Sequence, residues 1–199
     1  MKRIILPSAN QHPTFIGAWR LSPLTICDQI VDYFDTHSNQ QIAGVSASGK
    51  LDLSIKNRKD ITLCPNTLSK INSKVFIHYF ESLALCLKDY GVQWPFAQKI
   101  FESFDIGAFN IGKYEKGQHF GQVHTERSFI NMEREFAFMT YLTDKVEGGC
   151  TYFTHYDLNI KPQKGLTLIW PAMWTHAHRG NTVTQGEKYI ITGWLDLKG

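Results

Sequence analysis

Two stretches in the first half of the chain carry apolar residues at helical spacing. The first predicts a helix that is capped by Ser22, has Pro23 at its first position and ends near Ser38. The second follows Pro65 and is expected to end at Gly91. The apolar stripes are Ile26, Ile30, Val31 and Phe34 in the first helix, and Leu68, Ile71, Val75, Tyr79, Leu83, Cys86, Leu87 and Tyr90 in the second. Because these side chains are mostly aliphatic or aromatic, we expect both helices to pack against a core.

The segment between these helices, residues 41–62, contains glycines and a polar run from Lys56 to Asp60. It predicts short strands joined by a mobile loop. We expect Lys56, Arg58 and Lys59 to form a solvated charge run; the alternative is that they belong to a loop that closes over a substrate.

After about residue 104 the pattern changes to short β-type runs that are separated by turn signals such as Lys116-Gly117 and Gln185-Gly186. Strands are predicted at 105–114, 119–125, 135–143, 150–154, 158–161, 165–170 and 188–197. Many short strands with regular turns are typical of an antiparallel sandwich or barrel. No repeat or linker divides the chain, so we expect one α+β domain over residues 1–199, with helices supporting a mainly β core.

The composition narrows the class of protein. The chain has 199 residues, of which 43% are hydrophobic and 20% charged, as expected for a soluble globular protein. Its net charge of only +3 argues against a protein built mainly to neutralise phosphates. No apolar run is long enough for a membrane-spanning helix, and the run before Pro7 is too short for a secretory signal. The four cysteines include no C-x-x-C pair, so a reduced, cytoplasmic protein is expected.

One set of residues in the predicted β region can hold a metal ion. His124 and Glu126 end a predicted strand, and side chains two apart in a strand point the same way. About fifty residues later, His176 and His178 offer a third ligand. Two histidines and one carboxylate on one face of an ion leave the opposite positions open. This arrangement suits non-haem Fe(II), which must accept a co-substrate and O₂ together.

The strand that begins at Lys188 adds a positive charge. Period-2 alternation places Lys188, Ile190, Thr192 and Trp194 on one face, with Tyr189, Ile191 and Leu195 on the other. A lysine on the inward face of a barrel strand is costly unless an anion pairs with it, and a dicarboxylate would supply that partner. The alternative is an edge lysine whose ammonium reaches water.

The order and spacing of these motifs carry a resemblance to a known family. The motifs are Tyr114, His124-x-Glu126, Tyr141-Leu142, Gly148-Gly149, Trp170-Pro171, His178-Arg179-Gly180 and Lys188-Tyr189. Together they resemble the Fe(II)/2-oxoglutarate-dependent dioxygenases, and among these the prolyl 4-hydroxylase-like branch of bacteria and phages. The resemblance covers roughly residues 101–199. It implies a double-stranded β-helix (jelly-roll, cupin-like) core there, and assigns residues 1–100 to helical support and a substrate-side loop.

The resemblance also implies roles for particular residues. His124, Glu126 and His178 would bind iron, and Lys188 would pair with the distal carboxylate of 2-oxoglutarate. The remaining co-substrate residues would be Tyr114 in the pocket lining, Tyr141 as a hydrogen-bond donor, and Thr192 and Trp194 in the wall beside Lys188. The implied cofactors are Fe(II), 2-oxoglutarate and O₂ as co-substrates, and ascorbate to restore oxidised iron.

The assignment of the metal ligands leaves two alternatives. His155 and Asp157 are also a His-x-acid pair, and Asp is the family's usual residue where this chain has Glu126. Only about twenty residues separate that pair from the distal histidines, so we interpret both as loop or surface residues. His176 competes with His178, but the interval to Lys188 and the following Arg-Gly favour His178. His176 is then expected to be exposed, or to lie behind the ligands.

Other residues have weaker claims to a functional role. Cys150 is expected to be a small packed thiol. His119 and Arg127 flank the ligand pair and are expected either to touch substrate at the mouth of the site or to be solvated. Trp170 and Trp174 are expected to pack in the core or at the rim.

The expected function is therefore hydroxylation of an unactivated C–H bond, with succinate and CO₂ as co-products. The family analogy favours a prolyl residue in a peptide or protein as substrate. Two alternatives stay open: a nucleic-acid demethylase of the same superfamily, and a non-catalytic metal-binding module on the same fold. The first usually uses arginine for the co-substrate and has a basic binding face, and neither feature is evident here.

Overall fold

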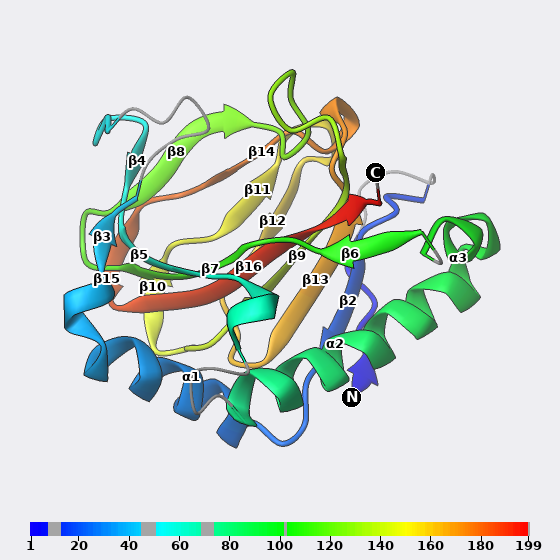
Figure 1. Cartoon of the computed structure of the whole chain (residues 1–199). Coiled ribbons are helices and arrows are strands. Elements are labelled where there is room, and N and C mark those ends of the chain that lie inside the picture. Colours follow the sequence, from blue (N-terminus) through cyan, green and yellow to red (C-terminus); the bar gives the residue numbers. More distant parts are fainter. Residues whose placement is uncertain (8–12, 45–50, 69–73, 102, 199) are drawn as a thin grey trace.

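The computed structural model describes residues 1–7, 13–44, 51–68, 74–101 and 103–198. Most of its strands lie in two antiparallel sheets that face each other, with two long helices along the outside of the larger sheet (Figure 1). The helices are α1 (Thr25–Thr36), α2 (Lys74–Gln93) and α3 (Pro95–Phe101), with 3₁₀ turns η1 (Ser38–Gln40), η2 (Pro65–Thr67), η3 (Thr154–Tyr156) and η4 (Trp174–His176). The strands are β1 (Lys2–Arg3), β2 (Gly17–Arg20), β3 (Ile42–Ala43), β4 (Lys56–Asn57), β5 (Lys59–Leu63), β6 (Phe104–Ile106), β7 (Phe109–Tyr114), β8 (His119–His124), β9 (Arg134–Tyr141), β10 (Val146–Gly148), β11 (Thr151–Phe153), β12 (Leu158–Ile160), β13 (Leu166–Pro171), β14 (His178–Gly180), β15 (Val183–Gly186) and β16 (Lys188–Leu197).

The two sheets have the topology of a double-stranded β-helix. The larger sheet has the order β1-β2-β13-β9-β16-β7-β5-β3, with β6 also paired to β16, and the smaller sheet has the order β12-β11-β14-β8-β4. From β7 onward the chain passes back and forth between the two sheets, with β11 and β12 as a hairpin within the smaller one, as in a jelly roll. The short ribbon of β10 and β15 joins the sheets at one end. The expected mainly β, jelly-roll class is confirmed.

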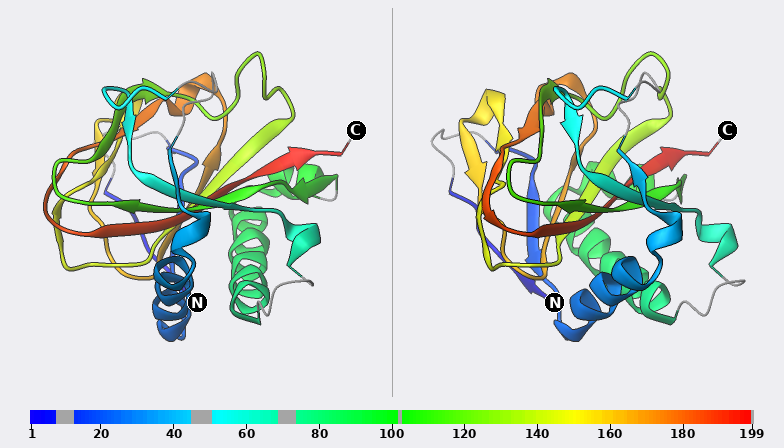
Figure 2. Two further views of the ribbon diagram at one scale, coloured as in Figure 1. Left: turned by 60° about the vertical axis from the view of Figure 1, so that its left-hand side comes forward. Right: turned by 90° about the vertical axis from the view of Figure 1, so that its left-hand side faces the viewer.

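Strand alternation divides the apolar side chains into two cores. On β16, Tyr189, Ile191 and Leu195 pack with the helices, whereas Ile190 points between the sheets. β9 repeats the pattern, because alternate side chains along it belong to different clusters. One core thus attaches α1 and α2 to the outside of the larger sheet (Figure 2). The second core fills part of the space between the sheets. The end of the barrel away from the helices is not filled by it and contains the candidate active site.

The predicted helices exist, but their ends differ from the expectation. α1 begins at Thr25, and its N-cap residue is Leu24, which makes no side-chain capping bond. Pro23 and Leu24 instead form a turn whose carbonyl groups accept bonds from Ile26 and Cys27. The capping role of Ser22 is therefore wrong.

The second helix passes through the position at which it was expected to end. α2 begins at Lys74 and continues to Gln93, because the carbonyl of Tyr90 accepts a bond from the amide of Trp94. Gly91 allows close approach of α3: a Cβ there would lie 3.0 Å from the Cβ of Gln98. The expected start after Pro65 holds only a 3₁₀ turn, and Ile71 lies outside the described residues.

Each predicted strand of the second half is present, and β1, β2, β10, β14 and β15 are additional. In the segment 41–62 the structure contains the short strands β3, β4 and β5, while residues 45–50, where a mobile loop was expected, lie outside the described residues. Among the helices of the described part, none combines the length and apolar character needed to cross a bilayer. The single-domain organisation stays a prediction.

Candidate active site

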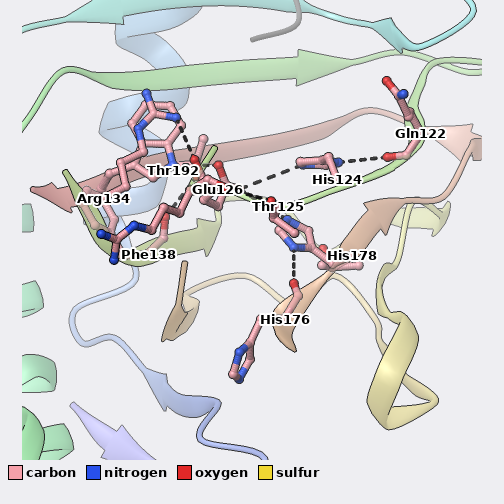
Figure 3. Close-up of polar contacts among 12 residues, drawn as sticks. Gln122, His124, Thr125, Glu126, Arg134, Phe138, His176, His178 and Thr192 are labelled. Atoms are coloured by element: carbon pink, nitrogen blue, oxygen red, sulfur yellow. Dashed lines mark hydrogen bonds and ion pairs between the residues drawn. The ribbon is translucent and has the colours of Figure 1, made fainter. Parts of the chain in front are cut away.

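His124, Glu126 and His178 lie together at the open end of the barrel, although His178 is more than fifty residues from the other two. His124 ends β8 and His178 begins β14, and the two residues are direct partners in the antiparallel register of these strands. One ligand atom from each of the three side chains lies within 4.8 Å of the other two. Nε2 of His178 is 3.3 Å and Nε2 of His124 is 3.9 Å from Oε1 of Glu126 (Figure 3).

Backbone carbonyl groups orient both imidazole rings. Nδ1 of His124 lies 2.9 Å from the carbonyl oxygen of Gln122, and Nδ1 of His178 lies 2.9 Å from that of His176 (Figure 3). A carbonyl oxygen can only accept, so each Nδ1 carries the proton and each Nε2 presents a lone pair to the site. Burial, with the nearby His178, lowers the pKa of His124 to about 4, which keeps the ring neutral near pH 7.

Glu126 is held as a charged acceptor. Its Oε2 accepts a hydrogen bond of 2.7 Å from Nε1 of Trp194, which leaves Oε1 facing the two histidines. Burial alone would raise the pKa of this carboxyl, but its contacts with His178, His124 and Trp194 outweigh burial and hold the pKa well below its usual range. Two imidazole Nε2 atoms and one carboxylate are a donor set that fits a divalent ion such as Fe(II). The longer side chain of Glu126, compared with the Asp usual in the family, reaches the histidines.

A cavity of about 90 Å³ extends from the three potential ligands into the barrel. The inward face of β16 forms one side of it, because Lys188, Ile190, Thr192 and Trp194 all line it. The period-2 prediction for this strand is thus confirmed in position. Thr192 donates a hydrogen bond to the carbonyl oxygen of Phe138, so its hydroxyl is also tied to the wall.

Lys188 lies inside the barrel and not at an edge. Its side chain is buried, with the residue 2% exposed, and Nζ donates to the carbonyl oxygen of Gly149 at 2.9 Å. Burial, and then the positive charge of Arg58, lower the pKa of this lysine to about 7. The alternative of an ammonium group reaching water is wrong. A buried ammonium whose charged form is disfavoured is suited to receive an anion.

The two predicted tyrosines differ in position. Tyr114 lines the cavity, and Nζ of Lys188 lies 3.9 Å from the centre of its ring. Tyr141 does not line this cavity; its hydroxyl donates to Oγ1 of Thr151, which does, at 2.6 Å. The predicted role of Tyr141 as a hydrogen-bond donor at the co-substrate therefore stays a prediction; Thr151 lies between its hydroxyl and the cavity.

The sequence interpretation missed a buried charge cluster beside this cavity. Lys56 and Arg58 are buried, and both pair with Asp60: Nζ of Lys56 lies 3.0 Å and Nε of Arg58 2.6 Å from its carboxylate oxygens. The expectation of a solvated charge run is wrong for these two residues, because β4 pairs with β8 and β5 with β7 and so draw the segment against the barrel. A signal was present: the three charged residues are spaced two apart, the period of a strand with one buried face.

The other candidates lie apart from the three potential ligands. His155 and Asp157 are exposed in and after η3, as expected. His176 is buried, which excludes the exposed alternative and agrees with the other one, a position behind the ligands; its ring lies 2.8 Å from the carbonyl oxygen of Thr14. Cys150 is a buried free thiol, as expected.

The residues expected near the mouth, His119 and Arg127, are not among the residues that line the inner cavity. Arg127 forms an ion pair with Glu135, and Nδ1 of His119 accepts a bond from the amide of Gly121. Trp170 is buried and lines the cavity, whereas Trp174 is 67% exposed.

A second, wider cleft of about 520 Å³ opens on the other side of the metal ligands. His124, Glu126 and Trp194 line both the inner cavity and this outer cleft. Arg134 lines the cleft with its guanidinium 3.6 Å from the centre of the Trp194 ring. A metal ion at the three ligands would thus face a small, cationic inner compartment and an open outer one.

Comparisons with known proteins agree with this arrangement. The model of the 2OG-Fe(II) oxygenase superfamily matches residues 109–196. A sequence relative, the probable prolyl 4-hydroxylase 9 of Arabidopsis thaliana, is 31% identical in an alignment of 115 positions that covers 44% of this chain and 40% of the relative. The chain thus spans well under half the length of that relative.

Two solved structures share the fold over almost the whole chain. The viral collagen prolyl hydroxylase of Paramecium Bursaria Chlorella virus-1, in its 2OG complex, has a TM-score of 0.65 at 17% identity and covers 93% of this chain and 97% of its own. A prolyl hydroxylase from Trichoplax adhaerens, in complex with a hypoxia inducible factor peptide fragment, has a TM-score of 0.70 at 14% identity. The match covers 92% of this chain and 84% of the Trichoplax chain.

The fold and the three potential ligands agree with those of the 2-oxoglutarate-dependent dioxygenases. Residues 109–196 match the model of the 2OG-Fe(II) oxygenase superfamily, and the resemblance within it is to the prolyl 4-hydroxylases.

Proposed function

We propose that the protein hydroxylates a C–H bond of a peptide or protein, with a prolyl residue as the favoured target. The observation that carries the proposal is that two compartments meet at His124 and Glu126: an inner cavity, which also contains His178 and the buried Lys188, and a wider outer cleft. In this proposal 2-oxoglutarate occupies the inner cavity and the substrate occupies the outer cleft.

The residues present fit the group that this chemistry requires. Both imidazoles present Nε2, and Glu126 presents Oε1, so His124, Glu126 and His178 would hold the ion. Ferrous iron bound there would catalyse the reaction of 2-oxoglutarate, O₂ and R–H to give succinate, CO₂ and R–OH. Lys188 would bind the far carboxylate and Tyr114 would donate to the same co-substrate, while the buried cavity wall would exclude water.

A peptide is the substrate class that the outer cleft and the comparisons favour. The related structure from Trichoplax adhaerens contains a peptide fragment, and the plant relative is named as a prolyl 4-hydroxylase. The net charge of +3 gives less support to a nucleic-acid substrate.

The experiment that tests this function is succinate release from 2-oxoglutarate with Fe(II), with and without a library of proline-containing peptides. Peptide-dependent succinate release, with one added oxygen atom in the peptide, is the expected result. His178→Ala is the matched control, and it should release no succinate above background. Stimulation by methylated oligonucleotides instead of peptides would support the demethylase, and absence of turnover with bound metal would support a non-catalytic module.

A further inference from the structure

Arg58 is a second cation at the inner cavity, and it comes from outside the family match. The residue lies between β4 and β5, is 6% exposed, and lines the cavity together with Lys188. Its Nη1 donates a hydrogen bond of 2.7 Å to the hydroxyl of Tyr114. Tyr114 thus has Arg58 at its hydroxyl and the ammonium of Lys188 over its ring.

The bond from Arg58 decides what the Tyr114 hydroxyl can do. A guanidinium can only donate, so the tyrosine oxygen is the acceptor and its own proton must point elsewhere. Among the described residues, the bond from Arg58 is the one hydrogen bond that this buried hydroxyl makes. A buried donor without an acceptor is costly, and the space it faces is the cavity. An anionic oxygen in the cavity would satisfy it.

The charges around Arg58 favour the same occupant. Asp60 is shared by Lys56 and Arg58, so the three side chains together carry one net positive charge. Protonated Lys188 adds another, and Glu126, which also lines the cavity, carries the one opposing charge. The side chains around the cavity are therefore net positive by one, which favours an anionic occupant.

Two glycines leave room for this cluster. A Cβ at Gly112 of β7 would lie 3.0 Å from Oδ1 of Asp60 and 3.2 Å from Cζ of Arg58. A Cβ at Gly44 would lie 2.9 Å from atoms of both side chains. The backbone thus fits closely around the Arg58–Asp60 pair.

We propose that Arg58 is a positioning residue for the co-substrate: it holds the Tyr114 hydroxyl as a hydrogen-bond donor toward an anionic oxygen of 2-oxoglutarate. The inference rests on the proposed function, because it assigns 2-oxoglutarate to the inner cavity. It adds a residue of the N-terminal half to a site whose potential metal ligands and predicted co-substrate residues all lie after residue 109.

The test is calorimetric titration of 2-oxoglutarate into the Mn(II)-loaded full chain, with Mn(II) affinity measured separately. Tyr114→Phe removes only the hydroxyl, and Arg58→Met leaves a balanced Lys56–Asp60 pair. Each should weaken 2-oxoglutarate binding about 10-fold or more, the effect of losing a hydrogen bond to a charged group. Mn(II) affinity should change by less than about 3-fold, and Arg58→Lys should restore part of the loss. Since Arg58 acts through Tyr114, the double variant should bind no more than about 3-fold more weakly than Tyr114→Phe.

Surface residues provide the matched controls. Tyr152 and Arg179 form a similar pair outside the cavity, with the guanidinium 5.2 Å from the ring centre, and Tyr152→Phe and Arg179→Met should bind 2-oxoglutarate as the unaltered protein does. Unchanged affinity in Tyr114→Phe, or losses that multiply in the double variant, would overturn the positioning role. If the unaltered protein binds Mn(II) but no 2-oxoglutarate, both the inference and the proposed function are wrong. If it binds 2-oxoglutarate and only the Arg58 effect is absent, the proposed function stands.

Discussion

His176 and His178 are two residues apart, yet the structure gives them different surroundings. The ring of His178 faces Glu126, whereas the ring of His176 lies against the carbonyl oxygen of Thr14. His176 contributes to the metal site through its backbone carbonyl, which accepts a hydrogen bond from Nδ1 of His178. Every amino acid has this carbonyl group.

His178→Ala should therefore abolish metal binding, whereas His176→Ala should keep it, because the carbonyl that orients His178 is retained. The measurement is the Mn(II) or Fe(II) content of each purified variant after dialysis, beside circular dichroism to show that both have folded. Metal loss in the folded His176 variant would mean that the third ligand is His176.

Trp194 is expected to act on the metal through Glu126. Its indole donates to Oε2 and so fixes which carboxylate oxygen faces the histidines. Trp194→Phe keeps the ring but removes this donor, and metal affinity should fall about 10- to 100-fold. Competition with a metal-sensitive dye measures the change. The exposed Trp174, which does not line the cavity, provides the control: Trp174→Phe should leave the affinity unaltered.

At the scale of elements, β5 contributes an acid that two buried cations share. Asp60→Asn would leave Lys56 and Arg58 without their carboxylate, and breaking a buried ion pair in this way typically costs about 3–5 kcal/mol. The free energy of unfolding, measured in urea, should fall by that order. The exposed Asp105 on β6 also pairs with a lysine, and Asp105→Asn should change the stability by less than about 1 kcal/mol.

The same strands show what the sequence could and could not predict. The alternation from Lys188 to Trp194 is local, so the face that lines the cavity could be read from the sequence. The burial of Arg58 is not local: it depends on pairing of β5 with β7 and on the missing side chain of Gly112. The predicted end of α2 at Gly91 was wrong for a similar reason, since the role of this glycine depends on the packing of α3 against it. Tertiary contacts therefore determine both the burial of Arg58 and the end of α2.

At the scale of the whole molecule, binding of an anion in the barrel should be linked to proton uptake. Burial and the charge of Arg58 lower the pKa of Lys188 to about 7, and a bound carboxylate would raise it again. Below pH 7 the lysine is already charged; above pH 7 it must gain a proton when the anion binds. Affinity for 2-oxoglutarate should therefore decrease as pH rises above about 7, by at most tenfold per pH unit.

Calorimetry of the Mn(II)-loaded protein in buffers of different ionisation enthalpy measures this proton uptake directly. Lys188→Met should bind 2-oxoglutarate more weakly and without this pH dependence. An affinity of the unaltered protein that stays constant from pH 6 to 9 would contradict the role of Lys188.

The segment that carries Arg58 also joins the two sheets. β4 pairs with β8 of the smaller sheet, and two residues later β5 pairs with β7 of the larger one (Figure 1). This short segment therefore crosses from one sheet to the other at the open side of the barrel, with Arg58 at its midpoint. Under the proposed function, a change that loosens this crossing would let the sheets separate and admit solvent at the 2-oxoglutarate site. Turnover without substrate hydroxylation and loss of 2-oxoglutarate affinity should therefore arise together.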